Sequence, residues 1–149
     1  PLDGMGGKSI YMMEEINEEE CKILKKLTNN YKTQIVIQEF LPDIYDGDFR
    51  VLIIHGEPYK KTLARIPQDG SFKGNLAAGG KGEVRDISDV QMRIGSVVGE
   101  YLMKKDINFA GIDIIGQKLT EINITSPTCA REIFEQSGMN PIEDYFKKL

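Results

Sequence analysis

Three oxygen-bearing side chains in the last third of the sequence are spaced to bind a metal ion. Asp113 lies in the apolar run Phe109 to Ile115, and Glu121 and Asn123 lie two residues apart in the next run, Lys118 to Ile124. Residues two apart in a strand point to the same face of a sheet, so a hairpin of these runs lets the three groups converge. Mg²⁺ prefers such oxygen ligands and leaves positions for phosphate oxygens. The alternative is a set of solvated polar positions, but an unpartnered Asp113 in an apolar strand would be costly.

Two glycine-rich stretches suggest contact with a ligand. The first contains Gly4, Gly6 and Gly7, and glycines let backbone amides approach an anion and turn toward it. We expect a phosphate-binding loop there, although the spacing is not that of the GxxxxGK[ST] loop and a plain loop is the alternative. The second stretch, Pro67 to Gly82, is longer than an ordinary connection and rich in glycine, which predicts a mobile lid.

The elements that must hold these residues alternate between strands and helices. Asn17 is expected to cap a helix that runs to about Asn30, and Ser88 with Gln91 predicts a capping box at the start of a second helix ending near Lys104. The expected strands are 34–40, 49–54, 59–66, 109–115 and 118–124, and short helices are expected over 131–136 and 142–148. This pattern predicts an α+β fold, a largely antiparallel sheet with helices packed on one face.

Composition narrows the class of protein. The 149 residues are 40% apolar, which suits one domain, and a net charge of -4 gives no basic field for nucleic acid. The partners expected from this charge are small molecules or protein. Apolar runs such as Val51 to Ile54 are far shorter than the roughly 20 residues of a membrane span, so no such span is expected. Cys21 and Cys129 have no metal-binding spacing, which favours a reducing cytoplasm. Because the sequence starts at Pro1 with no initiator Met or signal peptide, we expect a piece of a longer chain.

Five stretches of the sequence, taken in order, resemble the prokaryotic glutathione synthetase family of ATP-grasp ligases. They are residues 1–7 (PLDGMGG), 46–51 (DGDFRV), 63–67 (LARIP), 74–80 (GNLAAGG) and 119–128 (LTEINITSPT). Together they extend over nearly the whole chain, and the last two are the most specific. The resemblance implies one ATP-grasp domain over residues 1–149, in the C-terminal portion of a cytoplasmic enzyme that forms homo-oligomers.

The resemblance also implies an activity, the ATP-dependent ligation of γ-glutamylcysteine and glycine through an acyl phosphate. ATP and Mg²⁺ or Mn²⁺ are the implied cofactors. In the family, lysines that precede this segment hold ATP phosphates, so the piece alone is expected to be inactive. Two alternatives remain: a nucleotide-binding module without turnover, and another ATP-grasp ligase with a different amine acceptor.

Residue roles follow from the same resemblance. The metal ligands it implies are Asp113, Glu121 and Asn123. The ATP contacts it implies are Gly4, Met5, Gly6, Gly7, Glu39, Phe40, Leu41, Asp48 and Asn123. It makes Arg50 and Arg65 catalytic and substrate-binding, for which a surface ion pair is the alternative, and it adds the substrate contacts Lys73, Gly74, Asn75, Ser126, Pro127 and Thr128. Lys73 departs from the arginine that is common there, and a lysine lacks the guanidinium fork.

Overall fold

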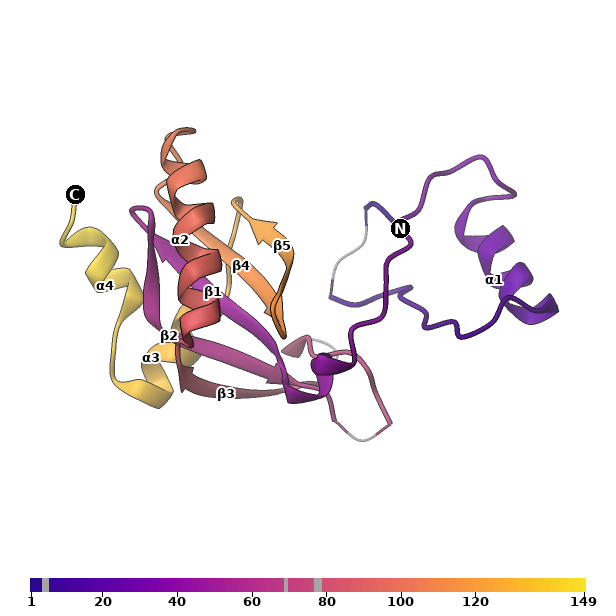
Figure 1. Cartoon of the computed structure of the whole chain (residues 1–149), viewed down its shortest axis with the longest axis horizontal. Helices are drawn as coiled ribbons and strands as arrows, with labels where there is room; N and C mark the ends of the chain where they lie inside the picture. Colours follow the sequence, from indigo (N-terminus) through magenta and orange to yellow (C-terminus); the bar gives the residue numbers. More distant parts are fainter. Residues whose placement is uncertain (4–5, 69, 77–78) are drawn as a thin grey trace. The chain divides into compact units, whose positions relative to one another are not determined.

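The structure, a computed structural model, describes residues 1–3, 6–68, 70–76 and 79–149 (Figure 1). The chain divides into two compact units, Pro1–Pro42 and Asp43–Leu149, and each is described by itself. That the two act as a single ATP-grasp domain remains a prediction. No helix of the described residues has the length and apolar character needed to cross a membrane.

In the first unit the structure describes the helix α1 (Glu18–Leu27), with Asn17 as its N-cap. The Asn17 side chain accepts hydrogen bonds from the backbone N–H groups of Glu19 and Glu20, which confirms the predicted cap. The helix ends at Leu27, three residues before the predicted end, where Thr28 caps it. The expected strand over residues 34–40 is wrong: its β-prone residues have no ladder partner among the described residues, and a strand is defined by such pairing.

The second unit contains a five-stranded antiparallel sheet in the order β3-β2-β1-β4-β5. Both predicted hairpins, β1–β2 and β4–β5, are present, and the α+β class is confirmed. The strand β3 was not predicted, because its sequence, KGEVRD, is rich in charged residues and its first two residues belong to the stretch predicted as a lid. The strands are β1 (Asp48–Ile54), β2 (Glu57–Ile66), β3 (Lys81–Asp86), β4 (Phe109–Ile115) and β5 (Lys118–Asn123), and a 3-10 helix, η1 (Pro42–Asp46), precedes them.

Helices cover both faces of this sheet (Figure 1), so the expectation of helices on one face only is wrong. The helix α2 (Asp89–Met103) packs Val98 and Leu102 against Val51 and Ile53. The helix α3 (Ala130–Ser137) packs Ile133 against the opposite face, and α4 (Pro141–Phe146) follows it. The reason lies in β1, whose consecutive residues 51–54 are all buried, as in a strand that is covered on both sides.

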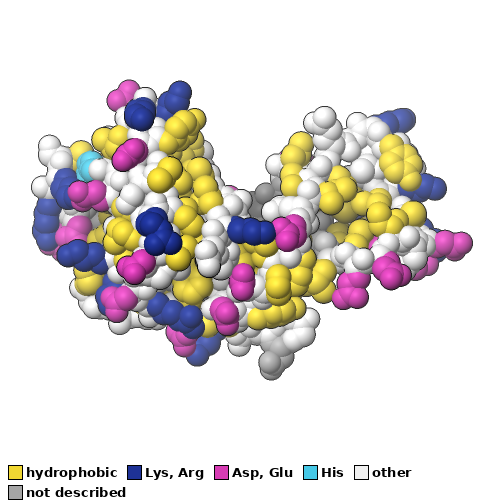
Figure 2. Space-filling model, in the orientation of Figure 1, with side chains coloured by type: hydrophobic (Ala, Val, Ile, Leu, Met, Phe, Trp, Pro, Cys, Tyr) yellow, Lys and Arg dark blue, Asp and Glu magenta, His cyan; other side chains and the backbone are white. Residues whose placement is uncertain are grey.

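The helix α2 begins with the predicted capping box, in which Ser88 and Gln91 bond each other's backbone N–H groups. Close packing holds it to the hairpin: a methyl group on Gly95 would lie 2.7 Å from Pro58 Cγ. Its outer flank carries exposed apolar side chains (Figure 2), with Val97 71% and Tyr101 58% exposed.

The outer edge of β3 is tied to α3 by one side chain. Gln136 accepts a hydrogen bond from the backbone N–H of Val84 (2.9 Å) and donates one to the carbonyl of Gly82 (3.2 Å). Both backbone groups belong to the last strand on that side of the sheet. The amide of Gln136 therefore uses the same two kinds of hydrogen bond that a neighbouring strand would use.

Candidate functional site

The strands β1, β2 and β4 bring four charged residues to one face of the sheet. Asp48 and Arg50 are two residues apart on β1, so their side chains share a face. The register places Arg65 opposite Asp48 and Asp113 opposite Arg50. This is the α3 side of the sheet, because Leu52 and Leu63, which alternate with the same parity, pack against Ile133.

Arg50 and Asp113 form a buried, two-pronged ion pair. The Nε of Arg50 donates to Asp113 Oδ1, and Nη2 donates to Oδ2 at 3.0 Å. Arg50 is 5% and Asp113 3% exposed, so the alternative of a surface ion pair for Arg50 is wrong. Thr62 supports the backbone here by donating its hydroxyl to the carbonyl of Arg50 (2.8 Å). A planar guanidinium held in this way has a fixed direction.

Arg65 joins Asp48 and Asp113 through a single nitrogen. Its Nη2 lies 2.6 Å from Asp48 Oδ2 and 2.8 Å from Asp113 Oδ2, and its Nε donates to the carbonyl of Asp48 at 3.2 Å. The two Nη2 contacts are charge contacts rather than well-directed hydrogen bonds. Burial by itself lowers the pKa of Arg65, but the carboxylates of Asp48 and Asp113 more than offset it, and the pKa is raised. The guanidinium stays charged.

Asp48 is the least satisfied member of this group. Burial raises the pKa of its carboxyl above the ordinary value of 3.8, although Arg65 acts in the other direction. Its Oδ1 is buried and has no hydrogen-bond partner within the part of the chain that the structure describes. A buried carboxylate oxygen without a hydrogen-bond donor disfavours the charged form, which agrees with the raised pKa of Asp48.

The predicted substrate turn, residues 126–128, lies against the arginine pair. The Nη1 of Arg50 donates to the hydroxyl of Thr128 at 3.3 Å. The next residue, Cys129, is buried and precedes α3 with a φ of 84°, in the left-handed region that non-glycine residues rarely adopt. Burial raises the pKa of the Cys129 thiol, which therefore remains protonated at neutral pH. The turn is thus fixed to the sheet on one side and to a core side chain on the other.

The three predicted metal ligands lie on neighbouring strands. Asp113 pairs with Glu121 in the β4–β5 register, and Asn123 donates its Nδ2 hydrogen to Glu121 Oε1 (2.8 Å). No group of three His, Cys, Asp or Glu side chains is placed to hold a metal among the described residues. The set here has two carboxylates and one amide, a donor chemistry that fits a hard cation whose remaining ligands come from phosphates.

The stretch predicted as a lid, 67–82, overlaps β3 at its end, and positions 69 and 77–78 lie outside the described residues. Gly74 is buried where a methyl group would contact the carbonyl of Arg65 and lie 3.2 Å from Asp48 Cβ. The N–H of Gly80 donates to the carbonyl of Asn75 (3.1 Å), and the ammonium of Lys73 lies 5.8 Å from the ring of Phe72. The structure therefore brings Gly74 beside the charged group, and motion of the stretch remains a prediction.

The remaining predicted ATP contacts belong to the first unit. Gly6 and Gly7 have φ of 62° and 73°, which suits a glycine loop that turns its amides toward an anion. Gly4 and Met5 lie outside the described residues. The strand expected over residues 34–40, which would have led into residues 39–41, is not formed in the part of the chain that the structure describes. The roles of all these residues remain predictions.

The pairing of Arg50 with Asp113 was missed by the sequence reasoning. The two residues are 63 positions apart, and their strands are joined through β2, β3 and α2. Local pattern gives no signal for such a non-local register. The one available indication was that a buried Asp113 needed a cationic partner.

The family of the chain follows from its similarity to known proteins. Residues 1–138 match the model of the family described as "Prokaryotic glutathione synthetase, ATP-grasp domain". Proteins named glutathione synthetase from Vibrio parahaemolyticus and Escherichia coli O157:H7 are each 50% identical over 133 residues, which is 89% of this chain and 42% of theirs. The one from Xanthomonas campestris is 46% identical over 140 residues, which is 94% of this chain and 44% of its own. The chain spans less than half the length of these relatives, and it belongs to the ATP-grasp domain family of prokaryotic glutathione synthetases.

Proposed function

We propose that this chain is the part of a glutathione synthetase that binds ATP and carries out the ligation. In the proposed reaction ATP phosphorylates the cysteinyl carboxylate of γ-glutamylcysteine, which gives an acyl phosphate and ADP. The amine of glycine then attacks the acyl carbon, phosphate leaves, and an amide bond forms. The task of the protein in such a reaction is to orient the substrates and to balance the charge of the transferred group.

The observation that carries the proposal is the buried pair of arginines beside the 126–128 turn. Arg50 reaches Thr128 while its other two nitrogens are held by Asp113, and Arg65 is held beside it. Two guanidinium groups in fixed positions are suited to a carboxylate that becomes an acyl phosphate, because each can bind an oxyanion. We therefore assign Arg50 and Arg65 to the reacting carboxylate, and residues 126–128 with residues 73–75 to the substrate.

For the nucleotide, we propose from family membership that Asp48 binds a ribose hydroxyl; its Oδ1 has no partner among the described residues but is buried, so it would have to become accessible when the nucleotide binds. Glycines 4, 6 and 7 would cover the phosphates, and residues 39–41 would meet the adenine. The last of these assignments rests on family membership alone.

For the metal, Asp113, Glu121 and Asn123 would hold Mg²⁺ or Mn²⁺. The cation would neutralise phosphate charge when bound. Asp113 Oδ2 is already contacted by both arginines, whereas among the described residues the side-chain contact recorded for Oδ1 is that with Arg50. Since a carboxylate oxygen has two acceptor positions, Oδ1 is the atom of Asp113 that we assign to the metal.

The test is an assay of a full-length protein that contains this chain. With ATP, Mg²⁺ and γ-glutamylcysteine, we expect ADP and glutathione to form with glycine and little product with alanine or serine. A preference for another amine would favour a different ATP-grasp ligase. ATP binding without ADP formation would favour a nucleotide-binding module. Both outcomes contradict the proposal.

We further propose that the full-length enzyme works in the cytoplasm as a homo-oligomer. The two cysteines are unpaired in the structure, which suits a reducing compartment. The oligomer rests on the family resemblance and is testable by light scattering of the full-length protein.

A further inference from the structure

Gly111 lies on β4 directly below the side chain of Arg50. It pairs with Leu52 of β1, one pleat from the Arg50–Asp113 pair, and shares the face of Asp113. A methyl group at this position would lie 2.9 Å from Arg50 Cδ and 3.4 Å from its Nε. The side chain of Arg50 therefore reaches Asp113 by passing through the space that any other residue at position 111 would fill.

The same space is closed from above by the substrate turn. The methyl group at position 111 would also lie 2.9 Å from Pro127 Cβ. The Arg50 side chain and Pro127 thus both pack directly on the backbone of Gly111. Its φ is not in the left-handed region, so the backbone conformation itself is open to alanine. The need for glycine here is one of space.

We propose that Gly111 is a positioning residue that sets the direction of the Arg50 guanidinium and, at the same time, the height of the 126–128 turn above the sheet. The contact of Arg50 with Asp113 and its contact with Thr128 both require the arginine stem to lie flat on β4. A side chain at position 111 lifts the stem and the turn together. The consequence for catalysis rests on the proposed role of Arg50, whereas the geometric inference does not.

The structure offers a matched control. At Gly95 of α2, an added methyl group would lie 2.7 Å and 3.0 Å from two carbons of Pro58, an overlap of similar size. Gly95 packs with Ile53, on the face of the sheet away from Arg50. Gly111→Ala and Gly95→Ala therefore place similar strain in the same fold, but only the first touches Arg50.

The first measurement is the side-chain Nε–H resonance of Arg50 in ¹⁵N-labelled full-length protein, assigned with Arg50→Lys. We expect Gly111→Ala to shift or broaden this resonance and Gly95→Ala to leave it in place. A resonance that does not move in Gly111→Ala overturns the inference. This outcome is independent of whether the protein ligates anything.

The second measurement is ligation by the same variants, compared at equal folded fraction. We expect Gly111→Ala to lower kcat/KM for the dipeptide by about ten- to a hundredfold, the size expected when a positioning contact is displaced, with KM for ATP within about twofold of the wild type. Gly95→Ala should retain kcat/KM within about threefold. In an Arg50→Ala background, Gly111→Ala should have a smaller effect than in the wild type, since residues that act through one another are not additive and only the contact with Pro127 remains. Full additivity overturns the inference, while an inactive wild type contradicts only the proposed function.

Discussion

Arg65 and Asp113 contact each other across an intervening strand. Arg65 belongs to β2 and Asp113 to β4, with β1 between them, yet Nη2 and Oδ2 are 2.8 Å apart. The contact links three strands through side chains, in addition to their backbone ladders. Both side chains are 4% exposed, so neither charge has water as a substitute partner.

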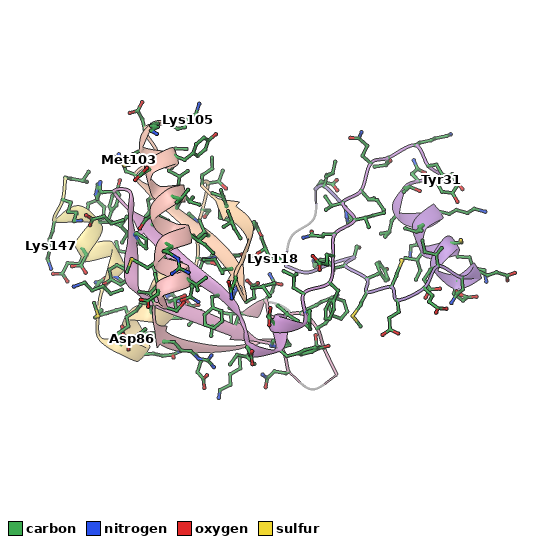
Figure 3. The ribbon with its side chains drawn as sticks, viewed as in Figure 1. Tyr31, Asp86, Met103, Lys105, Lys118 and Lys147 are labelled. Atoms are coloured by element: carbon green, nitrogen blue, oxygen red, sulfur yellow. The ribbon has the colours of Figure 1, made fainter. Side chains whose placement is uncertain are left out.

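Arg65→Ala should therefore destabilise the chain strongly. The substitution removes the guanidinium in contact with the Asp48 carboxylate and leaves the weaker charge interaction with Arg50. Removing one partner of a buried ion pair costs about 3 to 5 kcal/mol. Urea unfolding monitored by circular dichroism measures the loss. Lys61→Ala is the matched control. The partner of Lys61, Asp86 (labelled in Figure 3), has an exposed side chain, so the loss of this pair should cost less than about 1 kcal/mol. Equal losses in the two variants would contradict the buried network.

The raised pKa of Asp48 predicts a pH dependence of stability. Because the folded state binds this proton more tightly than the unfolded chain, the contribution of Asp48 is most favourable below 3.8 and is lost as pH rises through the folded pKa. The unfolding free energy of the wild type minus that of Asp48→Asn should therefore fall as pH rises from 3.8 through the folded pKa of Asp48. Urea unfolding at several pH values measures it, and ¹³C titration of the carboxyl gives the pKa directly. A pKa below the ordinary value would reverse the sign.

The left-handed backbone at Cys129 predicts an inverted substitution order. Glycine adopts a φ of 84° freely, whereas alanine is strained there, so Cys129→Gly should be more stable than Cys129→Ala by about 1 kcal/mol. Both variants lose the buried thiol, and the glycine variant also loses the buried Cβ, which makes the difference smaller than the full cost of left-handed backbone for alanine. Gly138, at φ 73° with open space around it, supplies the control: Gly138→Ala should cost about the same amount. Thermal or urea unfolding decides the order, and a more stable alanine variant at position 129 would show that the turn relaxes.

The metal assignment predicts the effect of removing one ligand. Glu121→Gln should weaken Mn²⁺ binding in the presence of ATP by about tenfold or more, since a neutral amide replaces a carboxylate on a hard cation. Electron paramagnetic resonance of free Mn²⁺ measures the affinity without turnover. Glu135→Gln, an exposed acid on α3, is the control and should have no effect. Unchanged binding in Glu121→Gln would show that Glu121 is not a metal ligand.

The chain alone should fold but ligate poorly. It spans 42% of the length of several relatives, and the family resemblance implies that lysines outside this segment hold ATP phosphates. Loss of one charge-assisted phosphate contact removes roughly 1.5 to 3 kcal/mol, or about ten- to a hundredfold in rate. Assays of the chain beside the full-length protein, after circular dichroism has shown that the chain is folded, should differ by more than about tenfold. Similar rates would mean that the rest is dispensable for the reaction.

The sequence predicted elements whose causes are local. Asn17 and the pair Ser88 and Gln91 act within one helical turn, and the β4–β5 turn at Gly116 joins adjacent runs. The prediction failed where the structure of a segment depends on a partner far away in the sequence. Residues 34–40 have strand composition but no ladder among the described residues, and the charged β3 is a strand because β2 pairs with it.

The same division holds for the site. The shared face of Asp113, Glu121 and Asn123 follows from hairpin spacing and is confirmed by the register of β4 and β5. The partner of Asp113 does not follow from spacing, because the register of β1 against β4 is set by the packing of the whole sheet. The helices on both faces could have been predicted from the four consecutive apolar residues 51–54. A strand covered on one face only would alternate apolar and polar residues.

The hydrogen bonds of Gln136 to the outer edge of β3 bear on behaviour in concentrated solution. An open strand edge invites another molecule to add a strand, and repeated addition leads to fibrous aggregates. By occupying the N–H of Val84 and the carbonyl of Gly82, the amide of Gln136 leaves an incoming strand without two adjacent bonding positions. One side chain of α3 thus protects this edge from self-association, and its replacement by an apolar residue would expose a template for polymerisation.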